Sequence, residues 1–313
     1  MMDWTDRHCR YFHRLLSRHA LLYTEMVTTG ALIHGDVPKH LDFNPQEHPV
    51  ALQLGGSEPA DLAQAAKLGE KWGYQEINLN CGCPSERVQR GAFGACLMAE
   101  PQLVADGVKA MRDAVTVPVT VKHRIGLDRG ESYDFVRDFV GTVAQAGCEH
   151  FIVHARNAWL QGLSPKENRE GPPLKPEWVL RLKADFPTLS FVINGGITTS
   201  TQMVQHLKDL DGVMVGREAY HRPWFLSEWD GLMGMPSAPL DRDAVEDQMV
   251  HYMSAQASKG VAWFSISRHM LGLRHGQAGA RRWRQVWSDH RLKNHSALEV
   301  AQWARQALAV SNA

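Results

Sequence analysis

Two cysteines, Cys81 and Cys83, lie one residue apart in the stretch NLNCGCPSER, residues 78–87. A thiol here could bind a metal ion or act as a nucleophile or proton donor, because its ordinary pKa of about 8.5 lies near neutral pH. A structural zinc site needs about four ligands at suitable spacing, and only one further thiol, Cys96, lies nearby. The spacing disfavours a metal site and leaves two interpretations of Cys83, a reactive thiol or a small buried residue.

Polar residues also follow the other short apolar runs of the sequence. In parallel α/β barrels the reacting groups gather at the carboxyl ends of the strands, and a buried polar group needs a hydrogen-bond partner. A bound ligand is the simplest common partner for such a set, so the sequence predicts a ligand site at this edge. The residues are Gln53, Asn78, Asn80, Lys122, His154, Asn194, Gly195, Gly196, Gly216 and Arg217.

The last two polar ends contain glycine, in NGG at residues 194–196 and in VGR at residues 215–217. Glycine lets backbone N–H groups approach phosphate oxygens, and Arg217 would add a charge-assisted contact. Barrels of this kind build a phosphate site after strands seven and eight, although a plain turn is the other interpretation of any single glycine. No G-x-G-x-x-G motif follows a strand, so a Rossmann dinucleotide site is not indicated.

Seven short β-rich runs must position these residues, with helix-period segments such as residues 58–73 and 101–115 between them. Alternation of strand and helix predicts a parallel sheet and an α/β fold of the (β/α)8 TIM-barrel type. The expected strands cover residues 22–27, 50–54, 76–80, 117–122, 150–155, 190–195 and 212–216.

A closed barrel of this type has eight strands, and the sequence shows seven. The chain opens on MMDWTDRHCRYFHRLLSRH, which predicts a loop, a helix cap at Thr5 or Asp6, and then a helix. The sequence thus begins inside a βα unit. We expect that it starts at an internal methionine and that a longer protein carries the first strand.

The pattern changes after about residue 235, where GMPSAPLDRD is followed by helical segments without strands. We expect a catalytic domain over residues 1–235 and an all-helical domain over residues 236–313. Residues 241–313 contain 10 Lys and Arg against 6 Asp and Glu. The cations suit a phosphate-binding face, although a solvated helix face is the alternative, and Trp283 and Trp287 are expected in the core. Seven of these cations lie between residues 268 and 293, namely Arg268, Arg274, Arg281, Arg282, Arg284, Arg291 and Lys293.

The overall composition is neutral, with 34 basic and 34 acidic residues, and gives no hint of a nucleic-acid or membrane partner. Hydrophobic residues make up 44%, yet no apolar stretch is long enough to span a bilayer and no leader opens the chain. The five cysteines are odd in number and lack a secretory context, so they are expected to be reduced. These features predict a soluble, cytoplasmic protein, and we expect a monomer.

An ordered series of motifs extends over nearly the whole chain. It comprises MMDWTDRH, YTEMVTTGA, HPVALQLGG, EINLNCGCPSERVQ, PVTVKHRIG, VHARNAWLQGLSPKENRE, INGGI, DGVMVGREAY and SRHMLGL. With these motifs the chain resembles the tRNA-dihydrouridine synthases, most closely their A-type branch. The resemblance implies an FMN-dependent barrel with a helical tail. Such an enzyme reduces the C5–C6 bond of uridine 20, often with 20a, in the tRNA D-loop and uses NADPH as reductant.

The resemblance also implies a set of cofactor contacts. Gln53, Lys122 and His154 would contact the flavin, and a cation at Lys122 would stabilise negative charge on the reduced ring. Met1 and Met2 would be the partial remnant of a Pro-Met pair beneath the flavin. The ribityl phosphate would be held by Asn194, Gly195, Gly196, Gly216 and Arg217.

The substrate contacts are implied in the same way. Hydride would pass from flavin N5 to uracil C6, and the resemblance makes Cys83 the donor of a proton to C5. Asn80 would contact the uracil, and Lys166, Arg169 and Arg268 would contact tRNA. Extruding a base from its stack costs a few kcal/mol, which contacts elsewhere must offset.

Two alternatives share some of these features. A small-molecule flavin reductase, such as a dihydroorotate or dihydropyrimidine dehydrogenase, has the barrel and FMN but does not need a basic tail. A non-catalytic RNA-binding protein built on an inactive barrel would not need Cys83, Lys122 and His154 together. The sequence therefore favours the RNA-modifying enzyme.

Overall fold

The computed structural model describes residues 1–128 and 132–309. Contacts divide the chain into two compact units. The first comprises Met1–Met2, Leu21–Phe43 and His48–Gly216, and the second comprises Asp3–Ala20, Asn44–Glu47 and the chain from Arg217 onward. This division concerns compactness, and the functional boundary between residues 235 and 236 stays a prediction. Within the described ranges, every helix is too short or too polar to cross a membrane.

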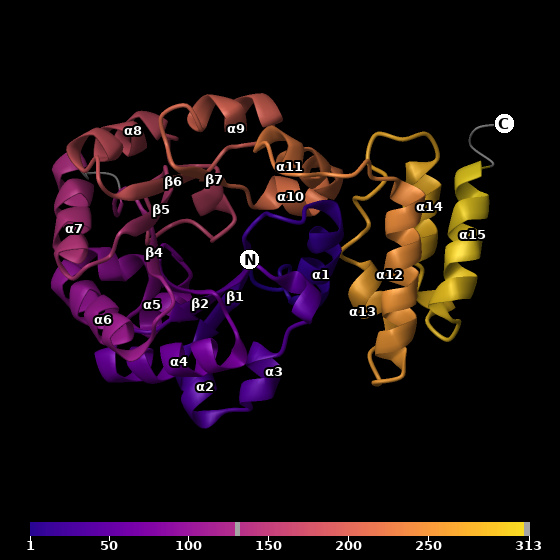
Figure 1. Ribbon diagram of the computed structural model, residues 1–313, viewed down its shortest axis with the longest axis horizontal. Helices are drawn as coiled ribbons and strands as arrows, with labels where there is room; N and C mark the ends of the chain where they lie inside the picture. The colour runs from indigo at the N-terminus through magenta and orange to yellow at the C-terminus, as the bar shows by residue number, and fades with distance from the viewer. Residues whose placement is uncertain (129–131, 310–313) are drawn as a thin grey trace. The chain divides into compact units, whose positions relative to one another are not determined.

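The first unit is built on a curled sheet of seven parallel strands in the order β1 to β7 (Figure 1). The seven predicted strands and the α/β fold are confirmed. The pairing register places Gln53 opposite Asn78, Asn80 opposite Lys122, and His154 opposite Asn194. The strands are β1(Leu22–Thr28), β2(Val50–Gly55), β3(Glu76–Cys81), β4(Val119–Arg124), β5(His150–His154), β6(Ser190–Asn194) and β7(Gly212–Met214).

Helices follow the strands and cover the outer face of the curled sheet (Figure 1). The helix α4(Pro59–Trp72) shows why they form, since it has proline in its first turn and the left-handed Gly73 at its end. A Cβ on Gly69 would lie 2.6 Å from a methyl of Leu52, so glycine lets this helix pack closely on β2. The other helices are α2(Thr29–His34), α3(Val37–Leu41), α5(Glu86–Arg90), α6(Pro101–Ala114), α7(Tyr133–Gln145), α8(Pro176–Asp185) and α9(Ser200–His206).

The strands of the first unit divide their side chains between two faces, because successive side chains alternate along a strand. In β3, Ile77 and Leu79 are buried in the apolar core, at 0% and 1% exposure. The alternate residues Glu76, Asn78 and Asn80 form hydrogen bonds to polar side chains of neighbouring strands. The sheet therefore has an apolar outer face under the helices and a polar inner face.

The regular elements of the second unit are all helices within its described residues, which confirms the predicted helical tail. Its helix α1(Arg7–Leu16) begins after Asp6, whose carboxylate accepts the N–H groups of His8 and Cys9, so of the two predicted caps Asp6 is the correct one. The remaining elements are η1(Pro45–Glu47), α10(Arg217–His221), η4(Pro223–Glu228), α11(Trp229–Leu232), α12(Arg242–Ala257), α13(Trp263–Ser267), α14(Ala280–Trp287), η5(His290–Leu292) and α15(Ala297–Ala309).

A buried carboxylate, Glu246, organises the C-terminal helices. Its Oε1 accepts hydrogen bonds from the indole Nε1 atoms of Trp283 at 2.9 Å and Trp287 at 3.0 Å, and its Oε2 accepts one from Arg274 at 2.6 Å. Both tryptophans are buried, as predicted. The assignment of Arg274 to a phosphate-binding face is wrong, because its side chain is 4% exposed and paired with Glu246 and Asp243.

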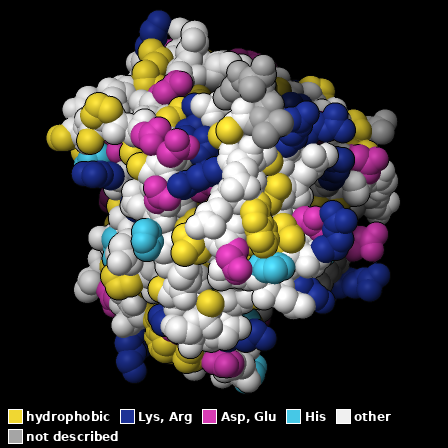
Figure 2. Space-filling model, turned by 90° about the vertical axis from the view of Figure 1, so that its right-hand side faces the viewer, with side chains coloured by type: hydrophobic (Ala, Val, Ile, Leu, Met, Phe, Trp, Pro, Cys, Tyr) yellow, Lys and Arg dark blue, Asp and Glu magenta, His cyan; other side chains and the backbone are white. Residues whose placement is uncertain are grey.

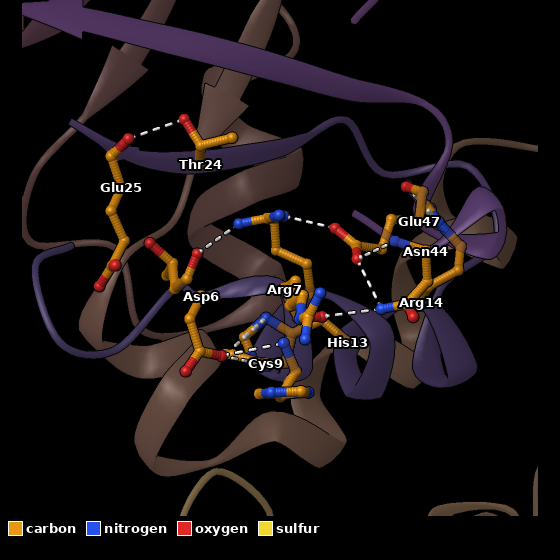
Figure 3. Close-up of polar contacts among 12 residues, drawn as sticks. Asp6, Arg7, Cys9, His13, Arg14, Thr24, Glu25, Asn44 and Glu47 are labelled. Carbon is orange, nitrogen blue, oxygen red and sulfur yellow. Dashed lines mark hydrogen bonds and ion pairs between the residues drawn. The ribbon is translucent and has the colours of Figure 1, made fainter. Parts of the chain in front are cut away.

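A second buried carboxylate, Glu47, ties η1 to the first helix (Figure 3). Arg10 donates to its Oε2 at 2.6 Å, Asn44 donates to its Oε1 at 2.8 Å, and Arg14 donates to its backbone carbonyl at 2.9 Å. Burial raises the pKa of Glu47, and Arg10 opposes that shift. Residues 44–47 and α1 thus belong to one polar cluster, although barrel strand β1 lies between them in the sequence.

Candidate active site

The sheet brings the predicted polar residues of β2 to β6 to one edge. Asn80 donates from Nδ2 to Gln53 Oε1 at 2.8 Å, which joins the ends of β3 and β2. Lys122 donates from Nζ to Asn194 Oδ1 at 3.2 Å, which joins β4 to β6. His154 ends β5 directly beside Asn194 in the strand register. Residues separated by more than 100 positions in the sequence therefore share a rim.

Cys83 lies in the turn that follows β3, and its backbone is held on both sides. The N–H groups of Gly82 and Cys83 donate to Asn80 Oδ1 at 3.0 and 2.9 Å. The carbonyl of Cys83 accepts the N–H of Ala95 at 2.9 Å. Gly94 has φ +75°, and a Cβ there would lie 2.7 Å from that carbonyl, so glycine is needed at this approach. The turn presents a half-buried thiol at the strand end.

The other described thiols have different surroundings. Cys81 is fully buried, and burial raises its pKa far above the ordinary value for a thiol. Cys9 and Cys148 are also buried, while Cys96 is half-buried with its pKa raised by burial. The described residues contain no group of three or more His, Cys, Asp and Glu side chains suited to a metal ion.

Positive charge is concentrated around the thiol. Burial lowers the pKa of Lys122 to about 8, with the cation of Arg124 acting in the same direction and negative charge on Cys83 opposing it. Burial also lowers the pKa of His154 well below its ordinary value, and the neighbouring cations, first Arg124, add to the shift. At pH 7 His154 is therefore a neutral imidazole, while Lys122 remains mostly protonated. The rim favours a ligand that carries or develops negative charge.

Arg124 is a component of the site that the sequence analysis did not single out. Its buried guanidinium donates to three backbone carbonyls at 2.9 Å, those of Gly82, Asn157 and Asn168. It therefore links the cysteine turn to the loop that follows β5. The available signal was its position two residues after Lys122 on the same strand, where the period of two places both side chains on one face.

One of the two predicted phosphate loops, residues 194–196, has glycines where a side chain would not fit. Gly195 and Gly196 have φ +112° and +70°, and a Cβ on Gly195 would lie 2.6 Å from the imidazole of His154. A Cβ on Gly216 would lie 3.5 Å from the Met1 sulfur, which places half-buried Met1 beside this loop. Met2 is 56% exposed. Arg217 begins α10 in the second unit, directly after Gly216.

The predicted RNA-contacting residues are accessible in the described structure. Lys166 is exposed and Arg169 half-buried in the loop after β5, where buried Asn168 donates to Trp159 O and accepts from Trp159 N. In the second unit, Arg268 is exposed and donates to Asp6 at 3.2 Å.

The surface over the C-terminal helices carries a mixture of charges. Figure 2 shows that side chains of Lys and Arg are interspersed with acidic and histidine side chains on this face. Arg291, one of the predicted phosphate-binding cations, pairs with Asp289 at 2.7 Å. With Arg268, the other exposed cations of this predicted set are Arg281, Arg282, Arg284 and Lys293.

Comparison with known proteins relates the chain to a family. Residues 1–309 match the profile of the family described as "Dihydrouridine synthase (Dus)". The chain belongs to the dihydrouridine synthase family. Among curated relatives of this family, the tRNA-dihydrouridine(20/20a) synthase of Shewanella oneidensis is 55% identical over 98% of this chain and 92% of its own length. The protein with the same name from Pseudomonas syringae pv. tomato is 59% identical over 94% of this chain and 88% of its own length.

A solved structure supports the fold of this dihydrouridine synthase. Morphinone reductase superposes with a TM-score of 0.51, covering 78% of this chain and 85% of its own, at 12% sequence identity. At that identity the likeness concerns the fold alone. Together with the family match, it confirms the TIM-barrel type predicted from the alternation of strands and helices.

Proposed function

We propose that this enzyme reduces uridine to 5,6-dihydrouridine in tRNA, at position 20 and also at 20a. The proposal is supported by the relatives that carry this name at 55–59% identity across almost the whole chain. Within the structure, the supporting observation is that one strand edge combines the half-buried thiol of Cys83 with Lys122 and His154. A dihydropyrimidine product requires one hydride and one proton, and this edge offers a proton donor.

FMN fits the residues present. The left-handed Gly195 and Gly196 leave backbone N–H groups accessible where a Cβ would collide with a neighbour, as a phosphate loop requires. Lys122 would provide a cation beside an anionic ring, with Gln53, His154 and Met1 as further flavin contacts. Asn194, Gly216 and Arg217 would complete the phosphate site. When bound, FMN would supply the hydride for uracil C6, and NADPH would restore the reduced cofactor.

Cys83 supplies the proton in this proposal. Its S–H bond breaks as a C–H bond forms at uracil C5, and the negative charge left by hydride addition at C6 passes to sulfur. Arg124 and Lys122 lie close enough to interact electrostatically with that sulfur and would stabilise the thiolate. Cys81 is unsuited to the role, because burial keeps its thiol protonated and out of contact with solvent.

The test compares the two neighbouring thiols. Cys83→Ala is expected to lower the rate of dihydrouridine formation at least 100-fold, a typical loss for a proton-transfer group, while retaining bound flavin. Cys81→Ala is expected to keep the rate within about threefold, because it removes only a small buried group. Dihydrouridine in tRNA would be measured by mass spectrometry of digested nucleosides, and bound flavin by absorbance near 450 nm.

Substrate class needs its own control. Purified enzyme would be supplied with NADPH and either unmodified tRNA, free uracil or dihydroorotate. Turnover of a free pyrimidine without turnover of tRNA would replace the proposal with a small-molecule reductase. Normal turnover of tRNA by Cys83→Ala would remove Cys83 from the mechanism. A colourless protein that binds tRNA without reducing it would indicate a non-catalytic binding role.

Arg169, Lys166 and Arg268 are proposed tRNA contacts, together with Asn80 as a contact to the extruded uracil. Neutralising a phosphate-binding cation weakens RNA binding and reduces its salt dependence without affecting a buried cofactor. Arg169→Ala should therefore weaken tRNA binding while flavin content is unchanged, as measured by filter binding at several salt concentrations. Lost flavin with unaltered RNA affinity would assign Arg169 to the cofactor site instead.

A further inference from the structure

A line of side-chain hydrogen bonds crosses the polar inner face of the sheet and ends at the cysteine turn. We name it the amide relay, and it consists of Asn80, Gln53, Asn78, Thr120 and Glu76. From one end to the other, Asn80 donates to Gln53 at 2.8 Å, Gln53 to Asn78 at 2.9 Å, Asn78 to Thr120 at 2.8 Å, and Thr120 to Glu76 at 2.6 Å. We propose that Glu76 is a positioning residue that fixes the direction of this relay and thereby the group that Asn80 offers to a ligand.

The cysteine turn sets the direction at one end. Two backbone N–H groups, those of Gly82 and Cys83, point at the Asn80 side chain, and an N–H can only donate. The atom facing them must therefore be Oδ1, which leaves Nδ2 to face Gln53. Gln53 then has to present its oxygen to Asn80 and its nitrogen to Asn78.

Glu76 sets the same direction at the other end. Its Oε1 accepts the hydroxyl protons of Thr120 and Tyr23 at 2.6 and 2.7 Å. With its proton directed to Glu76, the hydroxyl of Thr120 can only accept from Asn78 Nδ2, so Asn78 presents Oδ1 to Gln53. Asn78 and Thr120 are at most 2% exposed, so water cannot replace a wrongly oriented partner. The two ends independently require the same orientation of every amide.

This direction limits what Asn80 can recognise. Both lone pairs of its Oδ1 are used by Gly82 and Cys83, and one N–H is used by Gln53. One Nδ2–H of Asn80 is left to form a hydrogen bond with a ligand. It can donate to an acceptor such as a carbonyl oxygen, but it cannot pair with an amino group, which is also a donor. If the proposed function holds, that acceptor belongs to the extruded base. Glu76, about four residues along β3 and roughly 13 Å away, would thus reinforce, from the far end of the relay, a contact that it does not make.

The test reverses the relay. Asn80→Asp would place an oxygen against Gln53 Oε1, so Gln53 and Asn78 would have to turn over and Thr120 would donate to Asn78 instead. The Thr120 hydroxyl oxygen would then face the Glu76 carboxylate oxygen with a lone pair, and no proton would lie between the two oxygens. Glu76→Gln, with its amide nitrogen at that point, supplies one N–H to Thr120 and a second N–H to the Tyr23 hydroxyl, which can accept as well as donate. The double variant satisfies every member in the opposite direction.

Thermal unfolding of the flavin-free protein would measure the coupling. Asn80→Asp alone is expected to lower Tm by about 3 °C, and adding Glu76→Gln is expected to restore at least half of that loss. Substitutions this far apart normally add independently, so additive Tm shifts would overturn the proposal. Any attraction between the introduced carboxylate and Lys122 is present in both the single and the double variant and cancels from the comparison.

Tyr23→Phe is the matched control, because it removes a hydroxyl bonded to the same Glu76 oxygen but outside the relay. Combined with Asn80→Asp, it should give additive shifts. Rescue of Asn80→Asp by Tyr23→Phe would show a general loosening near Glu76 and would contradict a directional relay.

The catalytic consequence is measured separately with flavin-loaded enzyme and tRNA. Glu76→Ala is expected to lower kcat about tenfold with little change in KM for tRNA, since it disorders the contact at the reacting base without touching the RNA-binding cations. Glu76→Gln, which keeps the acceptor, should retain most activity. Equal loss in both variants would contradict the relay. Absence of tRNA reduction by the unaltered enzyme would instead refute the proposed function and leave the unfolding cycle interpretable.

Discussion

Both compact units bury polar and charged groups, but they satisfy them differently. In the second unit, Glu246 receives two indole N–H groups and a guanidinium, so its partners all come from within the unit. At the strand edge of the first unit, the cation of Lys122 has one hydrogen bond within the described ranges, to Asn194, and keeps a depressed pKa. A buried charge whose hydrogen-bonding groups are all satisfied within the protein stabilises the fold. A buried charge with few partners instead indicates a ligand-binding site.

The largest expected effect breaks the complete cluster. Glu246→Ala leaves Trp283, Trp287 and Arg274 without their shared acceptor in a buried site, so the free energy of unfolding should fall by about 3–5 kcal/mol. Urea denaturation followed by tryptophan fluorescence would measure the loss. Asp243→Ala is the control, because Asp243 also pairs with Arg274 but is exposed, and its loss should cost less than about 1 kcal/mol. Equal losses would deny Glu246 its organising role.

A second prediction concerns acid sensitivity of the helical unit. Burial lowers the pKa of His13 to about 3 and that of His8 to about 4. Below pH 6.5 these two histidines are protonated in the unfolded chain but remain neutral in the folded chain. The free energy of unfolding therefore falls as the pH drops from 6.5 toward 4. For His13 the loss between pH 7 and pH 5 should be about 2 kcal/mol.

His13→Gln should flatten this dependence, because glutamine does not titrate. The midpoints of denaturant unfolding at pH 7, 6 and 5 would be compared between the variant and the unaltered chain. An unchanged slope in His13→Gln would show that other groups cause the acid sensitivity.

The smallest expected effect on stability comes from the ligand edge, and it has the opposite sign. Lys122→Met removes a desolvated cation with few partners, so the free energy of unfolding of the flavin-free protein should rise by about 1 kcal/mol. FMN binding, followed by quenching of flavin fluorescence, should weaken at least tenfold. A destabilised variant that binds FMN normally would place Lys122 with the structural charges and erase the contrast between the two units.

Sequence patterns predicted the elements that depend on local spacing. The short β-rich run at residues 76–80 predicted a strand, and the polar pair Thr5 and Asp6 before a helical segment predicted a helix start. The same reasoning placed Trp283 and Trp287 in the core, because they lie four residues apart on one helix face.

Pairings between distant segments were beyond those patterns. Arg274 looked like one of several surface cations, and only the fold shows that it meets Glu246, 28 residues earlier in the chain. For Arg124 the period of two after Lys122 could have indicated the face of the strand but not its role, since its three carbonyl partners lie in two loops. The sequence gives the charge of each side chain. Whether that charge is solvated, paired with another charge or available to a ligand depends on contacts between distant segments, which local sequence periodicity does not predict.

The second unit is discontinuous in sequence, and this has a consequence for synthesis on the ribosome. Helix α1 is translated long before most of its unit. Its partners within the unit include Tyr252, whose hydroxyl meets the imidazole of His8 at 2.7 Å, and His269, which meets Asp6 at 3.0 Å. At about 5–20 residues per second, more than ten seconds pass before those residues are made. During that time the apolar side of α1 stays exposed while the intervening strands assemble. We therefore expect this segment to bind a chaperone during synthesis.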